Sequence, residues 1–193
     1  MRLASRLIEL TEDWKYLIRR DGWRIAMPRV ARTVAAFPYR HIQFLVVSRS
    51  LLEPIPDPRP KIPLDLQSFE YPHLDFVSRE HLPSEANLCA QRLKKGHYGL
   101  VACHQGQVVG YGWGCTDISL EKIDLILTPG DVLCTDAFTC KAFRNQGVHT
   151  ALSLARWRLF KELGFKKVTA YIEIHNHASL AVWQKLGGNC STR

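Results

Sequence analysis

The sequence has no apolar run long enough to cross a membrane. About 18 to 20 consecutive apolar residues are needed to span a bilayer, and every apolar run in this 193-residue chain is shorter. We expect no secretory signal peptide either, because Glu9, Glu12 and Asp13 follow the basic N-terminus before an apolar stretch can form. We therefore expect a cytoplasmic protein.

The six cysteines form no Cys-x-x-Cys pair, and no neighbouring histidine stands at the spacing of a metal ligand set. Most of them lie within apolar runs. This pattern favours buried, reduced thiols, with a zinc site or a disulfide framework as the alternatives. We therefore predict no metal site. The residues are Cys89, Cys103, Cys115, Cys134, Cys140 and Cys190.

The sequence contains no internal repeat, and its apolar fraction of 46% is typical of a protein with a globular core. Five of the ten prolines fall within residues 54–63. Because proline lacks an amide N–H and cannot join a helix or sheet interior, we expect an extended connector here. We therefore divide the chain into a basic helical appendage with a strand (1–52), the connector (53–72) and a main domain (73–193).

Positive charge is concentrated near the N-terminus. Residues 1–50 hold ten Lys or Arg and four Asp or Glu, a net charge of +6 out of +8 for the whole chain. Apolar spacings of three and four predict two amphipathic helices there, at 3–20 and 23–36, followed by a strand at 41–48. We favour packing of the apolar helix faces on the protein; weak contact with an anionic membrane surface is the alternative. No nucleic-acid partner is expected.

The rest of the chain mixes strands and helices. The predicted order is strand 74–79, helix 82–96, a hairpin of strands 99–104 and 107–116, an ambiguous stretch at 118–127, strand 132–139, helix 147–163, strand 168–174 and a last helix capped by Asn176. This order predicts a mixed α/β fold (α+β class), with a mixed, mostly antiparallel sheet flanked by helices. The two strands before and after the long helix form the parallel pair of this sheet, joined by a right-handed crossover.

The turn before the long helix, Arg144-Asn145-Gln146-Gly147, has the chemistry of an anion site. Gly147 lets the backbone turn sharply and approach a ligand closely. The first N–H groups of the following helix have no intrahelical acceptor, and the helix dipole favours negative charge there. Arg144 adds a full positive charge. The segment therefore suits a phosphate or pyrophosphate, with an ordinary helix start as the alternative.

A second segment follows one strand later, where Asn176-x-x-Ser179 precedes a Lys-Leu-Gly run at 185–187. The two segments together resemble the GNAT superfamily of N-acetyltransferases. Its signatures are Arg/Gln-x-x-Gly-x-Gly/Ala after a central strand and, further on, Asn-x-x-Ala/Ser ending in Lys-Leu-Gly-Phe. The resemblance covers roughly residues 74–188 and includes a Val-Gly-Tyr run at 109–111.

The resemblance implies that acetyl-CoA lies between two parallel strands that splay apart. Its pantetheine arm pairs with the strand backbone, where an N–H near Thr139 polarises the acetyl carbonyl, and its pyrophosphate binds the loop. Asn176 reaches the arm from the other side. The implied cofactor-binding residues are Phe138, Thr139, Arg144, Asn145, Gln146, Gly147, Val148, His149, Thr150, Asn176 and Ser179.

The acceptor must be a neutral amine, so a base is needed. Asp136 is the first candidate, since it alternates with Cys134 and Phe138 on one strand face, an apolar setting that would make its carboxylate a stronger base. Glu173 on the neighbouring strand is the second, and water is a third. For both carboxylates the alternative is a charge paired with a nearby Arg or Lys.

Three positions depart from the family pattern. His149 replaces a Gly or Ala, where it either crowds the pyrophosphate or bonds to it. Trp183 replaces a Tyr that protonates the departing thiolate, and an indole N–H is no acid; the thiolate leaves unprotonated, or Tyr171, His149 or His175 substitutes. The family's final strand pair is missing after Gly188. Either the strand at 41–48 covers that sheet edge, or a partner chain does, as in a homodimer.

The function implied is an N-acetyltransferase that moves an acetyl group from acetyl-CoA to a primary amine by direct attack. The acceptor is a small amine, an amino sugar or a peptide amine, and no pocket signature selects among these. The alternative is a non-catalytic acyl-CoA-binding or interaction module of the same fold, which Trp183 and the missing strands favour.

Overall fold

A computed structural model describes residues 11, 13–19, 22–23, 26–28, 43–120 and 126–191 of the chain. The chain divides into two compact units, one made of residues 1–42 and 71–91, the other of residues 43–70 and 92–193. Among the described residues, no helix combines the length and the apolar character that crossing a membrane requires. The second unit contains the sheet and every segment singled out for chemistry.

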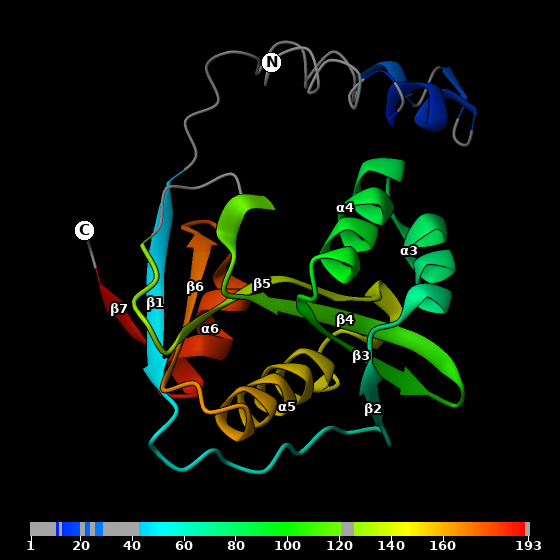
Figure 1. The fold of residues 1–193 in the computed structure, drawn as a ribbon. Helices are drawn as coiled ribbons and strands as arrows, with labels where there is room; N and C mark the ends of the chain where they lie inside the picture. Colours follow the sequence, from blue (N-terminus) through cyan, green and yellow to red (C-terminus); the bar gives the residue numbers. More distant parts are fainter. Residues whose placement is uncertain are drawn as a thin grey trace. The chain divides into compact units, whose positions relative to one another are not determined.

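The second unit is built on a seven-stranded mixed sheet, whose strands have the spatial order β2-β3-β4-β5-β6-β1-β7 (Figure 1). All neighbouring strands are antiparallel except β5 and β6. The predicted sheet, with one parallel pair near its middle, is therefore confirmed. The strands are β1 Phe44–Ser50, β2 Asp65–Ser68, β3 Tyr98–His104, β4 Gln107–Cys115, β5 Asp131–Thr139, β6 Lys167–Glu173 and β7 Asn189–Ser191.

The N-terminal strand β1 completes the sheet beside β6. All seven of its residues pair with β6, from Phe44 opposite Glu173 to Ser50 opposite Lys167. The strand predicted at 41–48 thus covers the edge that the sequence left open, so no partner chain is needed there. The short strand β7, which the sequence did not predict, pairs with the other edge of β1.

Within residues 43–120 and 126–191 the helices are α3 Leu74–Glu80, α4 Pro83–Lys94, α5 Val148–Glu162 and α6 His177–Lys185. The prediction of a strand at 74–79 is wrong, because these residues form α3. Its apolar run is too short for sequence spacing to separate the two periods. Phe76 and Val77 are both buried, which a helix allows for consecutive residues but a strand with one buried face does not. The same described residues contain the short 3-10 turns η1 Tyr71–His73, η2 Ile118–Leu120 and η3 Lys141–Phe143.

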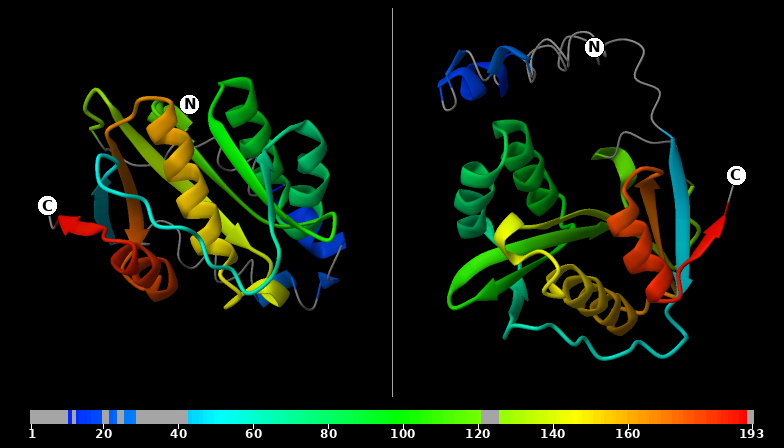
Figure 2. Two further views of the ribbon diagram at one scale, coloured as in Figure 1. Left: turned by 90° about the horizontal axis from the view of Figure 1, so that it is seen from below. Right: turned by 180° about the vertical axis from the view of Figure 1, so that it is seen from behind.

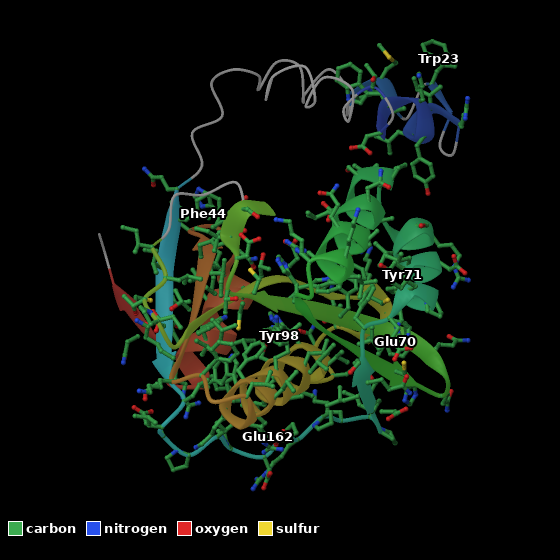
Figure 3. All side chains as sticks on the ribbon, in the orientation of Figure 1. Trp23, Phe44, Glu70, Tyr71, Tyr98 and Glu162 are labelled. Carbon is green, nitrogen blue, oxygen red and sulfur yellow. The ribbon has the colours of Figure 1, made fainter. Side chains whose placement is uncertain are left out.

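The main hydrophobic core joins α5 and α6 to strands β1, β5 and β6. Trp157 of α5 and Trp183 of α6 meet at its centre, with 5.1 Å between their ring centroids. Tyr98 of β3, labelled in Figure 3, packs against this core. Its ring meets Phe160 edge-on at a centroid distance of 5.8 Å. Burial of these aromatic rings supplies much of the apolar area that stabilises the unit.

The first unit is helical where the structure describes it. Residues 13–19 and 26–28 lie in helices, while the remainder of the helices predicted at 3–20 and 23–36 falls mostly outside the described residues. Asp13 is buried and its carboxylate accepts hydrogen bonds from the backbone N–H and the hydroxyl of Ser84, at 3.2 and 2.8 Å, at the start of α4. Asp13 therefore caps the start of α4.

Candidate active site

The parallel strands β5 and β6 pair over only part of their length. Their ladder runs from Asp131 opposite Lys167 to Leu133 opposite Thr169, yet β5 continues to Thr139 and β6 to Glu173. The two strands therefore part toward their carboxyl ends. A β5 backbone edge without a neighbouring strand can pair with an extended ligand, because strand amides need partners.

A hydrogen-bonded pair of side chains lies where the strands begin to part. The hydroxyls of Thr135 on β5 and Tyr171 on β6 are 3.4 Å apart. The Tyr171 ring meets Phe44 of β1 edge-on, with 5.5 Å between the centroids. These contacts fix the Tyr171 hydroxyl at the closed end of the gap between β5 and β6, which we call the strand gap.

Strand β5 carries a β-bulge beside the strand gap. Trp113 pairs with Thr135 and Tyr111 with Phe138, so two residues of β5 oppose one residue of β4. One of the two is Asp136, whose φ of 40° is unusual for a residue other than glycine. Bulges re-aim side chains next to active sites, and backbone strain of this kind gathers at functional sites.

Asp136 does not lie in the apolar setting expected from the sequence. Its side chain is 40% exposed, and its carboxylate pairs with the guanidinium of Arg92 on α4, which is 1% exposed. The Arg92 guanidinium also lies 5.9 Å from the centroid of the Trp113 ring. The alternative weighed for Asp136, a carboxylate paired with a nearby arginine, is what the structure contains.

A second buried arginine holds the bulge from the side of α5. Arg156 is 3% exposed and donates to the carbonyl oxygen of Trp113 at 2.7 Å. Burial lowers the pKa of Arg156. A Cβ at Gly112, the residue opposite the bulge, would lie 2.8 Å from the Arg156 guanidinium. Glycine at this position therefore makes room for the arginine.

The first turn of α5 contains His149, which is partly buried. Burial and, secondly, the charge of Arg156 lower the pKa of His149 to about 4. Its imidazole is therefore neutral at pH 7 and can offer a single N–H to an anion. A neutral ring also adds no positive charge to this helix end.

The loop between β5 and α5 has the geometry of an anion cradle. Arg144 is exposed, and its Nε donates to the carbonyl oxygen of Thr139 at 3.3 Å. Asn145 and Gly147 have φ angles of 61° and 84°, so both adopt the left-handed region. Gly147 is the N-cap of α5 and supplies no side chain to the first helix amides, which leaves those donors to a ligand.

Asn176 and Ser179 lie at the end of β6, on the other side of the strand gap. The side-chain oxygen of Asn176 accepts from the backbone N–H of Ser179 at 3.1 Å and caps α6. Glu173 is the last residue of β6 and is partly buried. Because the carboxyl ends of parallel strands meet at one edge, these residues and the loop after β5 flank the same opening.

Trp183 is a core residue. Its side chain is 4% exposed and packs on Trp157, so it cannot serve the gap as a proton donor. Arg92 and Arg156, which support the bulge, were missed in the sequence. A single arginine in an amphipathic helix carries no signal of burial, since most such residues face solvent.

Comparison with known proteins gives a family match and shared folds. A family model described as the acetyltransferase (GNAT) family matches residues 63–188. A GCN5-related N-acetyltransferase from Sphaerobacter thermophilus superposes with a TM-score of 0.58 at 16% identity, over 85% of this chain and 53% of that one. The chain thus spans about half the length of that relative. The comparison with curated proteins gave no match.

Two further solved structures share the fold. The ribosomal-protein-S18-alanine N-acetyltransferase of Escherichia coli has a TM-score of 0.56 at 13% identity, over 67% of this chain and 80% of that one. The aminoglycoside N-acetyltransferase AAC(6')-Iy, in complex with CoA, has a TM-score of 0.54 at 21% identity, over 68% and 91%. The family match covers well over half of the sequence, and the chain belongs to the GNAT acetyltransferase family.

Proposed function

We propose that the protein is an N-acetyltransferase that moves the acetyl group of acetyl-CoA to a primary amine by direct attack. The observation that carries the proposal is the strand gap, which opens next to the amide-rich start of α5. An extended arm with amides fits the free edge of β5, and a pyrophosphate fits the loop. Few other ligands combine these two features.

The residues divide the work of binding as follows. Phe138 and Thr139 offer their backbone to the pantetheine arm, and Asn176 and Ser179 close the arm from the side of β6. The arm then ends at the bulge, where a β5 amide aimed into the gap donates to the thioester carbonyl. The loop residues that bind the pyrophosphate are Arg144, Asn145, Gln146, Gly147, Val148, His149 and Thr150.

In the reaction the amine nitrogen attacks the thioester carbon, the carbon–sulfur bond breaks, and the amine loses one proton. Asp136 and Glu173 are the proposed bases. Asp136 lies at the bulge, where its exposed carboxylate forms an ion pair with Arg92. The proposed proton donor to the thiolate is Tyr171, because its hydroxyl lies in the strand gap beside Thr135. His149 and His175 are the other candidates.

The proposed class of acceptor, a primary amine, is based on the names of two relatives. The E. coli relative is an acetyltransferase of the alanine of ribosomal protein S18, and AAC(6')-Iy is an aminoglycoside acetyltransferase. We propose a primary amine of a peptide, an amino sugar or another small molecule for this chain. Amines of these types share one chemistry, attack by a neutral nitrogen.

A test mixes the protein, acetyl-CoA and a panel of primary amines and follows the release of the CoA thiol. Turnover with any amine supports the enzyme. Tight CoA binding without turnover favours a non-catalytic acyl-CoA-binding module, for which the burial of Trp183 in the core is the structural argument. Absence of CoA binding contradicts both functions.

A further inference from the structure

The proline-rich connector is fixed along α5 (Figure 2). Near the C-terminal end of the helix, Arg158 donates to the carbonyl oxygen of Pro56 at 2.9 Å and pairs with Asp57 at 2.6 Å. Lys161 donates to the carbonyl oxygen of Glu53 at 3.4 Å. The connector then runs toward the N-terminal end of the helix. Prolines limit its backbone freedom, so these few contacts hold it in place.

The connector meets the loop before α5 by close backbone contact. The N–H of Lys61 donates to the carbonyl oxygen of Gln146 at 2.9 Å. A Cβ at Gly147 would lie 3.0 Å from Cα of Pro60 and 3.5 Å from the carbonyl oxygen of Arg59. The glycine of the loop therefore admits the connector, and the connector in turn becomes one wall of the loop.

This contact brings additional positive charge to the loop. Arg59 and Lys61, which flank Pro60, are both exposed, as are Lys141 and Arg144 of the loop. Within the described part of the chain, no carboxylate pairs with Arg59 or Lys61. Residues 58–64 and 140–150 contain no Asp or Glu. The flexible stems of Arg59 and Lys61 start beside the loop, so their charged ends can reach an anion bound there.

We propose that Arg59 and Lys61 bind a phosphate of the donor's nucleotide, so that the connector forms part of the CoA site. The inference rests on the proposed function, and it assigns to the connector a role beyond joining β1 to β2. Two groups of CoA fit this role, the pyrophosphate and the ribose 3′-phosphate. Both are anions that guanidinium and ammonium groups bind well.

The test uses calorimetric binding of CoA and of 3′-dephospho-CoA to the full chain. The double variant Arg59→Ala, Lys61→Ala removes both charges but keeps the Lys61 N–H that holds the loop. The matched control, Lys94→Ala with Lys166→Ala, removes two exposed charges from other surfaces. We expect the connector variant to bind CoA about 10- to 30-fold more weakly than the wild-type protein, and the control to bind it normally.

The two ligands separate the sources of the effect. If only CoA binding weakens, the connector binds the 3′-phosphate; if both ligands lose affinity equally, it binds the pyrophosphate. Either result supports the proposal, and a lower salt dependence of the variant accompanies both. Equal CoA binding by the wild-type, connector and control proteins overturns it. If the wild-type protein binds neither ligand, the proposed function itself fails, and this inference fails with it.

Discussion

At the scale of single residues, the proposed chemistry of the site centres on the bulge at Asp136. Its backbone adopts a φ of 40°, and its carboxylate pairs with a buried arginine. A strained backbone kept at such a place aims a side chain or an amide at a ligand. In the proposed reaction this exposed carboxylate receives the proton of the amine, while Arg92 fixes its position.

Asp136→Asn keeps the shape of the side chain and removes the proposed base. We expect kcat to fall by about 100-fold, the lower end of what general base catalysis contributes, while the Kd of CoA stays unchanged. Glu173→Gln is the comparison, with a smaller effect if Asp136 is the main base. An unchanged kcat for Asp136→Asn would assign the residue to pairing with Arg92 alone.

Tyr171→Phe removes the hydroxyl that lies beside Thr135 in the strand gap. If this hydroxyl protonates the departing thiolate, kcat falls by about 10- to 100-fold and the alkaline limb of its pH profile shifts. Tyr98→Phe is the control, because Tyr98 packs in the core against Phe160 and Phe165. Equal pH profiles of wild-type protein and Tyr171→Phe would show that the thiolate leaves without help from this residue.

We expect His149 to make the fold sensitive to acid. Its pKa is lowered to about 4 in the folded state, against about 6.5 in an unfolded chain. As the pH falls from 6.5 to 4, the unfolded state binds a proton that the folded state does not, so stability decreases over this window. Between pH 7 and pH 4 the free energy of unfolding should fall in both proteins. We expect the fall in His149→Asn to be about 2 to 3 kcal/mol smaller than the fall in the wild-type protein.

Urea unfolding at the two pH values measures the difference. His177→Asn, at the exposed start of α6, is the control and should lose as much stability as the wild-type protein. A parallel loss in His149→Asn would mean that other groups cause the acid sensitivity.

The site residues could be only partly predicted from the sequence. The loop from Arg144 to Gly147 and the cap at Asn176 depend on local chemistry, so their positions follow from the residue order. The strand bulge depends on a mismatch between β4 and β5, and the pairing of Asp136 with Arg92 joins residues distant in sequence. No local pattern reports either feature.

At the scale of elements, β1 and the turn after it are parts of the core. Val47 and Leu51 are fully buried, and Arg49 donates to the carbonyl oxygens of Leu186 and Pro54 at 2.6 and 2.7 Å. These bonds join β1 to the end of α6 and to the connector. The elements with strong periodicity, α4 to α6 and β3 to β6, were predicted well; α3 was not, because a short apolar run suits either period.

Leu51→Ala and Leu52→Ala form a matched pair that tests this role. Leu51 has 0% exposure and Leu52 has 76%. A buried leucine truncated to alanine loses about 2 to 5 kcal/mol of unfolding free energy, whereas an exposed one loses about 0.5 kcal/mol or less. Chemical denaturation at neutral pH measures both values. Similar losses for the two variants would mean that the turn after β1 is not packed as described.

At the scale of the whole molecule, the sheet unites segments from both ends of the chain. β1 lies between β6 and β7, so the N-terminal part supplies a strand of the unit that contains the site. The helical unit is different, because residues 1–42 join residues 71–91 in it. The two parts of the N-terminal region, before and after Gln43, therefore have separate structural roles.

Two truncations separate these roles. Deleting residues 1–50 removes β1 with its buried Val47 and exposes the edge of β6, so we expect an unfolded or aggregating protein at any salt concentration. Deleting residues 1–42 keeps β1 and removes Asp13, whose carboxylate caps α4. The buried residues Leu17 and Ala26 are removed with it. All three belong to the helical unit and not to the unit with the sheet, so we expect the shorter truncation to retain its sheet and its CoA binding. Circular dichroism, hydrogen exchange and CoA calorimetry compare the two proteins.

If the longer truncation folds and binds CoA like the shorter one, β1 is dispensable and the packing assigned to Val47 is wrong.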